Sequence, residues 1–136
     1  MNTIAYIPGV WDLLHVGHVN ILESAKALCD RLVVGVAHDA IVKEDKDSFP
    51  IITHTDRARM LGALKSVDLV LIYTKLEFIT HLEMIQADIL IVGEWWGNDE
   101  RHIDAEEWIE DHGGRLIKLP YYKRESSTAI KQRIRV

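Results

Sequence analysis

Five short apolar runs set the strongest limit on how this chain can fold. They cover residues 4–7, 32–37, 69–73, 89–92 and 116–119. Runs of four to six apolar residues without polar alternation are typical of strands buried on both faces, as in a parallel sheet covered by helices. The segments between them carry apolar residues at helical spacing, so strands and helices alternate along the chain.

We expect helices over residues 18–29, 55–64, 77–86, 104–112 and 126–134. This order predicts an α/β fold, a three-layer α/β/α sandwich built on a doubly wound parallel sheet. The charged stretch 43–50, KEDKDSFP, has no periodicity. We expect it to be a loop, and its length makes it a candidate lid or binding loop.

Length and composition predict a single cytoplasmic domain over residues 1–136. No apolar run approaches the ~18–20 residues of a membrane span, and the start of the chain lacks a signal-peptide pattern. The single Cys29 excludes an internal disulfide and a multi-cysteine zinc site. A net charge of −5 argues against a general nucleic-acid binder, although a cleft can still attract one small anion.

The segment after the first run, PGVWDLLHVGH, is the strongest candidate for a functional site. In an open parallel sheet, ligands bind beyond the carboxyl ends of the strands, where the strand order reverses. Gly9 is expected to allow a tight turn. His15 and His18, with Gly17 between them at a helix start, can direct two imidazoles and backbone N–H groups at one phosphate. Such an array suits the stabilisation of charge on a phosphate in transfer.

Other chemistries are less well supported by the sequence. No nearby carboxylate or thiol completes a metal-ligand set around the two histidines. The dinucleotide fingerprint G-x-G-x-x-G and the Walker A pattern are absent, and no Ser-His-Asp or Cys-His set is evident. Taken alone, a histidine pair at a helix start is as often a cap or a solvated turn as a functional site. Its position after the first strand favours function.

Five motifs of this chain resemble those of the cytidylyltransferase-like nucleotidyltransferases, in the same order. GVWDLLHVGH is similar to G-x-F-D-x-x-H-x-G-H, with Trp11 in place of Phe. The others are DR with ML at 56–61, VD at 67–68, VGEWW at 92–96 and SSTAIK at 126–131. In pattern and size the chain is most similar to the small bacterial glycerol-3-phosphate cytidylyltransferases, and next to the ADP-heptose and archaeal FAD synthases.

Two departures from the family pattern leave the base and the acceptor open. The family's Arg-Thr falls on Tyr121 and Tyr122 and its Gly on Arg124, and the second Asp of its G-D-D-W motif falls on Trp95. The resemblance implies a Rossmann-like nucleotidyltransferase that transfers CMP from CTP to a phosphorylated alcohol such as glycerol 3-phosphate, with release of pyrophosphate. The alternatives are an adenylyltransferase of the FAD synthase or ADP-heptose type, and a non-catalytic nucleotide-binding module.

The resemblance also assigns roles to residues. His15 and His18 would bind the α- and β-phosphates, and Lys46, with Lys43 as its substitute, would close onto the phosphates. Arg57 would bind acceptor or phosphate. The implied catalytic residues are His15, His18, Lys46 and Arg57. The implied nucleotide-binding residues are Gly9, Val10, Trp11, His15, His18, Gly93, Glu94, Trp96, Arg124, Ser126, Ser127 and Thr128.

Partners follow from the same resemblance. A Mg²⁺ ion is expected to travel with the triphosphate on phosphate oxygens and water, with Asp12 and Asp39 as neighbours and no metal site of the protein's own. A homodimer is expected. The simpler interpretations are that Asp12 stabilises a turn, that Arg57 forms an ordinary ion pair, and that residues 126–128 cap a helix.

Overall fold

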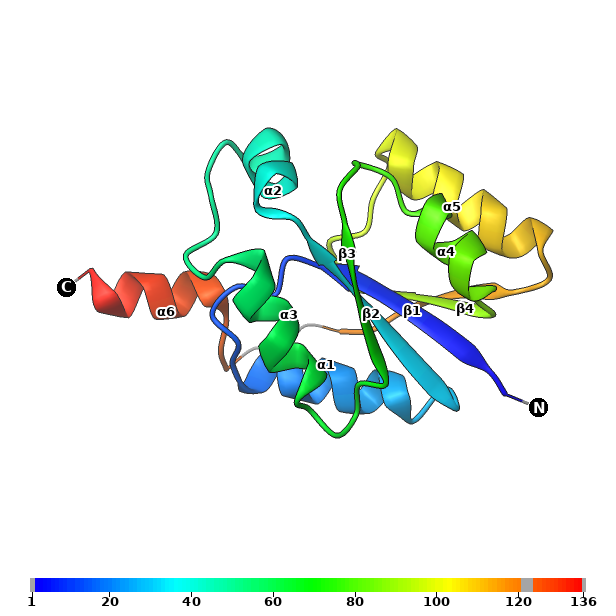
Figure 1. The fold of residues 1–136 in the computed structure, drawn as a ribbon, viewed down its shortest axis with the longest axis horizontal. Helices are drawn as coiled ribbons and strands as arrows, with labels where there is room; N and C mark the ends of the chain where they lie inside the picture. Colours follow the sequence, from blue (N-terminus) through cyan, green and yellow to red (C-terminus); the bar gives the residue numbers. More distant parts are fainter. Residues whose placement is uncertain (1, 121–123, 136) are drawn as a thin grey trace.

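Five parallel strands form the centre of the computed structural model, which describes residues 2–120 and 124–135. The strand order is β3-β2-β1-β4-β5 (Figure 1). The strands are β1 (Ile4–Gly9), β2 (Arg31–Ala37), β3 (Leu69–Tyr73), β4 (Ile89–Val92) and β5 (Arg115–Lys118). The predicted doubly wound α/β fold is therefore confirmed, and each of the five apolar runs forms a strand.

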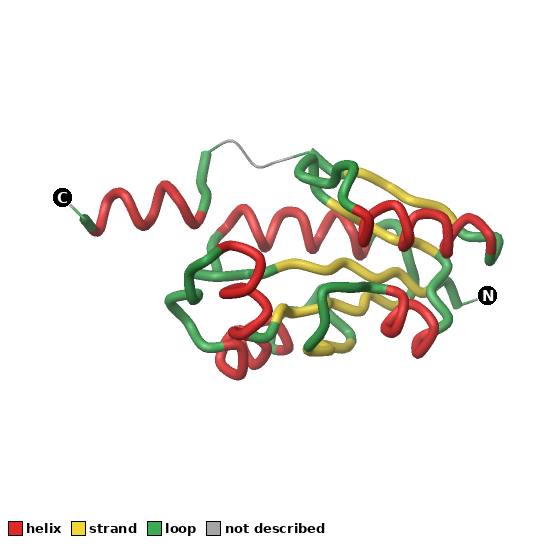
Figure 2. The backbone as a smooth tube through the Cα atoms, turned by 90° about the horizontal axis from the view of Figure 1, so that it is seen from above, coloured by secondary structure: helices red, strands yellow, loops and turns green. Residues whose placement is uncertain are grey.

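Helices connect the strands and cover both faces of the sheet (Figure 2). They are α1 (Val16–Lys26), α2 (Asp39–Lys46), α3 (His54–Gly62), α4 (Ile79–Ile85), α5 (Glu100–Asp111) and α6 (Ser127–Ile134). Helix α6 has no buried residue among those described, and it extends away from the sheet (Figure 1).

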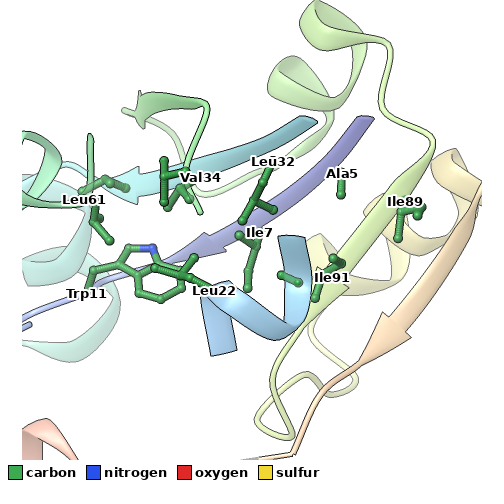
Figure 3. Packing of buried hydrophobic residues seen from close by; sticks show 12 residues of the cluster. Ala5, Ile7, Trp11, Leu22, Leu32, Val34, Leu61, Ile89 and Ile91 are labelled. Carbon is green, nitrogen blue, oxygen red and sulfur yellow. The ribbon is translucent and has the colours of Figure 1, made fainter. Parts of the chain in front are cut away.

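Two apolar clusters lie on opposite faces of the sheet. Leu22 of α1 and Leu61 of α3 pack against Ile7 and Val34 on one face (Figure 3). On the other face the cluster includes Tyr6, Leu82, Leu90, Ala105 and Ile109, which β1, α4, β4 and α5 contribute. Successive residues of a strand thus pack into the clusters on opposite faces of the sheet. This explains why the central strands are apolar at every position.

The strand order reverses between β1 and β4. From β1 the chain runs outward to β2 and β3, whereas β4 and β5 lie on the other side of β1. The carboxyl ends of β1 and β4, at Gly9 and Val92, therefore border the position at which open parallel sheets bind their ligands.

The predicted loop over residues 43–50 is partly wrong, because its first four residues complete α2. His38 caps this helix by accepting a hydrogen bond from the backbone N–H of Ala40 at 3.0 Å. Ile41 and Val42 are buried, and Asp47 ends the helix in a left-handed conformation with φ of 58°. A histidine cap and two adjacent apolar residues give little periodicity, so the charged composition concealed the helix.

Gly35 supports a close approach between β1 and β2. A Cβ atom at this position would lie 2.0 Å from the hydroxyl oxygen of Tyr6, which is fully buried and hydrogen-bonded to His81 Nδ1 at 2.6 Å. We expect Gly35→Ala to lower the free energy of unfolding by about 1–3 kcal/mol, because the tightly packed ring must move.

Urea unfolding measures this effect, and Gly62→Ala is the matched control. The nearest heavy atom to a Cβ at Gly62 is 3.9 Å away. In α3 the substitution should be neutral or stabilise by up to about 1 kcal/mol. Equal effects of the two substitutions would contradict the packing interpretation.

Candidate functional site at the carboxyl edge of the sheet

The turn from β1 into α1 uses left-handed residues that are not glycine. Trp11 and Leu13 have φ angles of 61° and 52°, whereas Gly9 does not have a positive φ. The prediction that Gly9 makes the tight turn is therefore wrong. Gly9 is needed for space instead, because a Cβ there would lie 2.9 Å from the indole of Trp11. That indole is buried and donates a hydrogen bond to Gly35 O at 3.0 Å.

Asp12 fixes the same turn from within. Its buried carboxylate accepts hydrogen bonds from the backbone N–H groups of Ile51, Ile52 and Leu13 at 2.8, 3.0 and 3.1 Å. Lys131 of α6 lies 3.6 Å from one carboxylate oxygen. These contacts fit the interpretation of a turn-stabilising carboxylate, with its oxygens directed at the protein backbone.

His15 and His18 cap α1 reciprocally. His15 Nδ1 accepts a hydrogen bond from Gly17 N at 3.0 Å, and His18 Nδ1 accepts one from His15 N at 3.3 Å. The two rings are stacked, with centroids 3.8 Å apart and planes inclined by 26°. The caps use only the Nδ1 atoms. The same two side chains can therefore cap the helix and also have a functional role through their other ring nitrogens.

This geometry fixes the tautomer of both rings. A nitrogen that accepts a hydrogen bond carries no proton, so the proton of each neutral ring is on Nε2. The backbone N–H groups of His15 and Gly17 are used by the caps. The Nε2–H groups of the two imidazoles are the ring donors that these caps do not use.

The electrostatics keep both rings neutral at pH 7. Burial, followed by the neighbouring His15, lowers the pKa of His18 to about 4. Burial also lowers the pKa of His15, and the carboxylate of Glu125 opposes this shift. Both shifts favour the neutral form of the ring, which is a hydrogen-bond donor.

The lowered pKa of His18 predicts a pH dependence of stability. In the unfolded chain a histidine has a pKa of about 6.5. The unfolded state then binds protons that folded His18 does not, so the free energy of unfolding falls as pH drops from about 6.5 toward 4 and is unaffected above that window. We expect His18→Asn to reduce this slope in denaturation series from about pH 7.5 to about pH 4.5. Identical slopes would contradict the assignment.

The N-terminus of α6 lies against the β1–α1 turn. The hydroxyl of Ser127 donates a hydrogen bond to the carbonyl oxygen of Asp12. Ser126 caps α6 by accepting from Ala129 N at 3.0 Å. Thr128, the next residue of α6, is exposed. The structure therefore brings Ser126, Ser127 and Thr128 next to the turn that carries the two histidines, and two helix N-termini converge there.

Arg57 is enclosed by the protein. Its side chain is fully buried and donates to Ile52 O at 2.8 Å, to Ala37 O at 2.9 Å and to Val10 O. It also pairs with Asp39 Oδ1 at 2.7 Å. The guanidinium thus links the residues at the ends of β1 and β2 to the segment before α3. It lies in the protein interior, under the β1–α1 turn.

Asp39 and two histidines complete this network. Burial opposes ionisation of Asp39, but the hydrogen bond and charge of Arg57, together with His54, lower its pKa. His54 stacks on His38 with ring centroids 3.9 Å apart. Neither histidine belongs to one of the sequence motifs. The one signal that could have drawn attention to them is the dipeptide His38-Asp39 directly after a buried strand.

The segment after β4 lies at the same edge of the sheet as the β1–α1 turn, on the β4 side. Gly93 is buried, Glu94 is exposed, and adjacent Trp95 and Trp96 differ sharply. Trp95 is 44% exposed, whereas Trp96 is 3% exposed and stacks on His102 with ring centroids 4.0 Å apart. Trp95 thus lies at the surface and Trp96 in the core.

The other predicted cations are exposed. Lys46 and Lys43 are exposed on α2, where Lys43 pairs with Asp47 at 3.2 Å. Arg124 is exposed ahead of α6. Tyr121 and Tyr122, onto which the family's Arg-Thr falls, lie outside the described residues. Over residues 2–120 and 124–135, no group of three or more His, Cys, Asp or Glu side chains is placed to hold a metal ion.

Comparisons with known proteins agree on the fold and the family. A family model described as cytidylyltransferase-like matches residues 6–133. The chain is 35% identical over 133 residues to the bifunctional protein HldE of Bradyrhizobium and 38% identical over 133 residues to that of Acidiphilium cryptum. Each match covers 97% of this chain and 27% of the relative, so the chain spans about a quarter of the length of these relatives.

Solved structures show the same architecture. The lipopolysaccharide core biosynthesis protein of Thermoplasma volcanium superposes with a TM-score of 0.75 and 26% identity, over 92% of this chain and all of that one. A protein of unknown function from Archaeoglobus fulgidus shares the fold with a TM-score of 0.66 and 17% identity, over 91% of this chain and 93% of that one. In the described part of this chain, no helix is long and apolar enough to cross a membrane.

Proposed function

The chain belongs to the cytidylyltransferase-like family, and from this premise we propose that it is a nucleotidyltransferase acting on a phosphorylated small molecule. In the proposed reaction, a nucleoside triphosphate and an acceptor phosphate form a nucleoside-diphospho product and pyrophosphate. The observation that carries the proposal is the stacked pair His15 and His18, which presents two neutral Nε2–H donors at the switch point of the sheet.

The proposed mechanism needs no protein nucleophile. An oxygen of the acceptor phosphate, already an anion at neutral pH, attacks the α-phosphorus and forms a new P–O bond. The bond from the α-phosphorus to the bridging oxygen breaks, and pyrophosphate leaves with that electron pair. Charge develops on the oxygens around the α- and β-phosphorus, where the Nε2–H groups of His15 and His18 would donate.

Other residues contribute to the proposal according to their position. Thr128 and the start of α6 would bind the outer phosphates, while Ser127 anchors α6 to the β1–α1 turn. Lys46 and Arg124 are exposed cations that would reach the phosphates from outside. Arg57 would act as a positioning residue, because its donors are used by the protein.

The segments around the nucleotide complete the assignment. Gly9, Val10 and Trp11 would border it through the backbone, and Gly93, Glu94 and Trp96 from the side of β4. Mg²⁺ would neutralise the triphosphate from phosphate oxygens and water. Pairing into a homodimer stays a prediction, which light scattering can test.

Two nucleotide–acceptor pairs are the leading candidates. The resemblance to the small bacterial glycerol-3-phosphate cytidylyltransferases favours CTP with a phosphorylated alcohol such as glycerol 3-phosphate. The match to a lipopolysaccharide core biosynthesis protein favours a phosphorylated sugar as acceptor, because such cores are built from sugars. The resemblance to the ADP-heptose synthases would pair this acceptor with ATP. The third hypothesis is a nucleotide-binding module without catalysis. It predicts that nucleotide binds without release of pyrophosphate.

A pyrophosphate-release screen tests the proposal. Four nucleoside triphosphates are assayed against glycerol 3-phosphate, a sugar 1-phosphate, ethanolamine phosphate, choline phosphate and FMN, with Mg²⁺ present. We expect pyrophosphate only when nucleotide and acceptor are both added, and a nucleoside-diphospho product of matching mass. Binding of nucleotide with no release under any combination would overturn the proposed activity.

A further inference from the structure

An ion pair joins two helices that follow different strands of the sheet. The guanidinium of Arg101, in the first turn of α5, lies 3.1 Å from a carboxylate oxygen of Asp45 in α2. Helix α2 follows β2 and α5 follows β4, and β1 lies between these two strands. The Arg101–Asp45 pair therefore connects the two sides of the switch point across the carboxyl end of β1. Figure 1 shows α2 and the start of α5 near this edge.

Tyr73, at the end of β3, shows how close this pair lies to the candidate site. Burial raises the pKa of Tyr73, and after burial the charges that act on it most are those of Arg101, which lowers it, and Asp45, which raises it. The Tyr73 hydroxyl donates a long hydrogen bond, of 3.4 Å, to the carbonyl oxygen of Gly9. The ion pair is thus near the residue at which β1 ends and the turn that carries the two histidines begins.

The contact uses a single nitrogen of the guanidinium. Arg101 Nη2 lies 3.1 Å from Asp45 and 3.5 Å from Asp99, so two carboxylates share it. Arg101 Nε is buried and has no hydrogen-bond partner among residues 2–120 and 124–135. The strong form of an arginine–carboxylate pair is bidentate and uses two nitrogens. A pair made by one shared nitrogen, with an unpaired donor beside it, is weaker and breaks more readily.

Asp99 gives Arg101 a second partner on its own side of the site. Asp99 is the N-cap residue of α5, and its side chain is 67% exposed. If α2 moves away, Arg101 keeps a carboxylate next to it, and no uncompensated charge is left in the protein. The arginine therefore has two arrangements, one that holds α2 and one that does not. A conformational exchange requires two such alternative arrangements of similar free energy.

Helix α2 is less firmly packed than the helices on the two faces of the sheet. Its buried residues, Ile41 and Val42, belong to a small cluster that is separate from the two main ones. Residues 43–49 are exposed, and Asp47 ends the helix in a left-handed conformation. Segments with few buried apolar contacts open at a lower free-energy cost than the core. We therefore expect α2 to move more readily than its neighbours, and Lys46 to move with it.

We propose that Arg101 is a positioning residue for nucleotidyl transfer and acts through Asp45. When Arg101 pairs with Asp45, α2 is closed over the end of β1 and Lys46 is held near the phosphates. When Arg101 pairs with Asp99 alone, α2 is released and substrates exchange. This inference rests on the proposed function, and it adds a residue that belongs to none of the sequence motifs.

Hydrogen exchange measured by mass spectrometry tests the closure of α2 without any turnover. The side chains of Arg101 and Asp45 are 18% and 34% exposed. For such a pair, Arg101→Met and Asp45→Asn should each speed the exchange of the α2 amides about 2- to 5-fold. In about 1 M salt, which screens charges beyond about 3 Å, the wild-type protein should approach the variants. Glu44→Gln is the matched control, because it removes an exposed carboxylate next to Asp45, and it should leave the exchange unchanged.

Kinetics in the pyrophosphate assay connect this closure to Lys46. Arg101→Met and Asp45→Asn should each lower kcat/KM by the same factor by which they speed exchange, about 2- to 5-fold. Arg101→Lys keeps the positive charge and should recover part of the loss. Because both residues act as one pair, the double variant should be no less active than either single variant. In a Lys46→Met background, Arg101→Met should cause no further loss.

The two measurements separate this inference from the proposed activity. Equal exchange of α2 in the wild type, Arg101→Met and Asp45→Asn would overturn the inference even if pyrophosphate is released. A full effect of Arg101→Met in the Lys46→Met background would also overturn it. If no acceptor gives pyrophosphate, the proposed function fails, and exchange still decides whether the ion pair closes α2. In that case CTP or ATP with Mg²⁺ should slow α2 exchange more in the wild type than in Arg101→Met, and equal slowing would contradict the inference.

Discussion

His15→Asn and His18→Asn should each lower turnover by about 100-fold or more, the scale typical of losing a transition-state donor. The Asn side chain places an oxygen close to the position of Nδ1, so it can still accept the backbone N–H that the ring caps. It has no group that reaches the position of Nε2. Steady-state turnover with saturating nucleotide and acceptor measures the effect, and urea unfolding shows whether the fold is kept.

The complementary substitution separates capping from catalysis. Gln places an amide nitrogen close to the position of Nε2, but it is a poor N-cap residue, so His15→Gln should lose less activity than His15→Asn. It should instead lose about 0.5–2 kcal/mol of stability. His112→Asn is the control for a histidine outside the site. Near-normal turnover in both Asn variants would end the proposed role of the pair.

The largest expected effect on stability is that of Arg57→Met, about 3–5 kcal/mol. Arg57 is fully buried, and the substitution leaves the carboxylate of Asp39 without its cation at 2.7 Å. It also leaves the carbonyl oxygens of Ile52 and Ala37 without their donor. Chemical denaturation measures the loss, and Arg57→Lys should give an intermediate value because an ammonium cannot satisfy all of these groups.

Arg59→Met is the matched control on the same helix. Arg59 is exposed, and substitution of such a surface residue usually changes stability by less than about 0.5 kcal/mol. A normal unfolding free energy in Arg57→Met combined with lost activity would show that the guanidinium acts on the substrate. That result would restore the role that the family resemblance implies and would exclude a positioning role.

The fold was predictable because burial on both faces leaves a direct mark on the sequence. Residues 32–37 and 89–92 are apolar at every position apart from Gly35, and they become central strands. Helix α2 escaped prediction because its N-cap is His38 and its exposed positions are charged. Its two apolar residues, Ile41 and Val42, are adjacent and give no helical period.

The sequence indicates the positions of the candidate site residues, but not their environments. The turn after β1 identifies His15 and His18, yet nothing in the sequence says which ring nitrogen is used by the cap. Arg57 and Arg59 are the same residue type two positions apart on α3, yet Arg57 is buried and Arg59 is exposed. Trp95 and Trp96 differ in the same way. Burial depends on which helix face meets the sheet and on contacts over long sequence separation, such as that of Arg57 with Val10.

A crystal structure with a bound, non-hydrolysable nucleoside triphosphate and Mg²⁺ tests the central claim most directly. The account predicts that Nε2 of His15 and Nε2 of His18 both lie about 3 Å from oxygens of the α- or β-phosphate, with the outer phosphates beside the start of α6. A triphosphate bound elsewhere, with both rings directed away from every phosphorus atom, would contradict it.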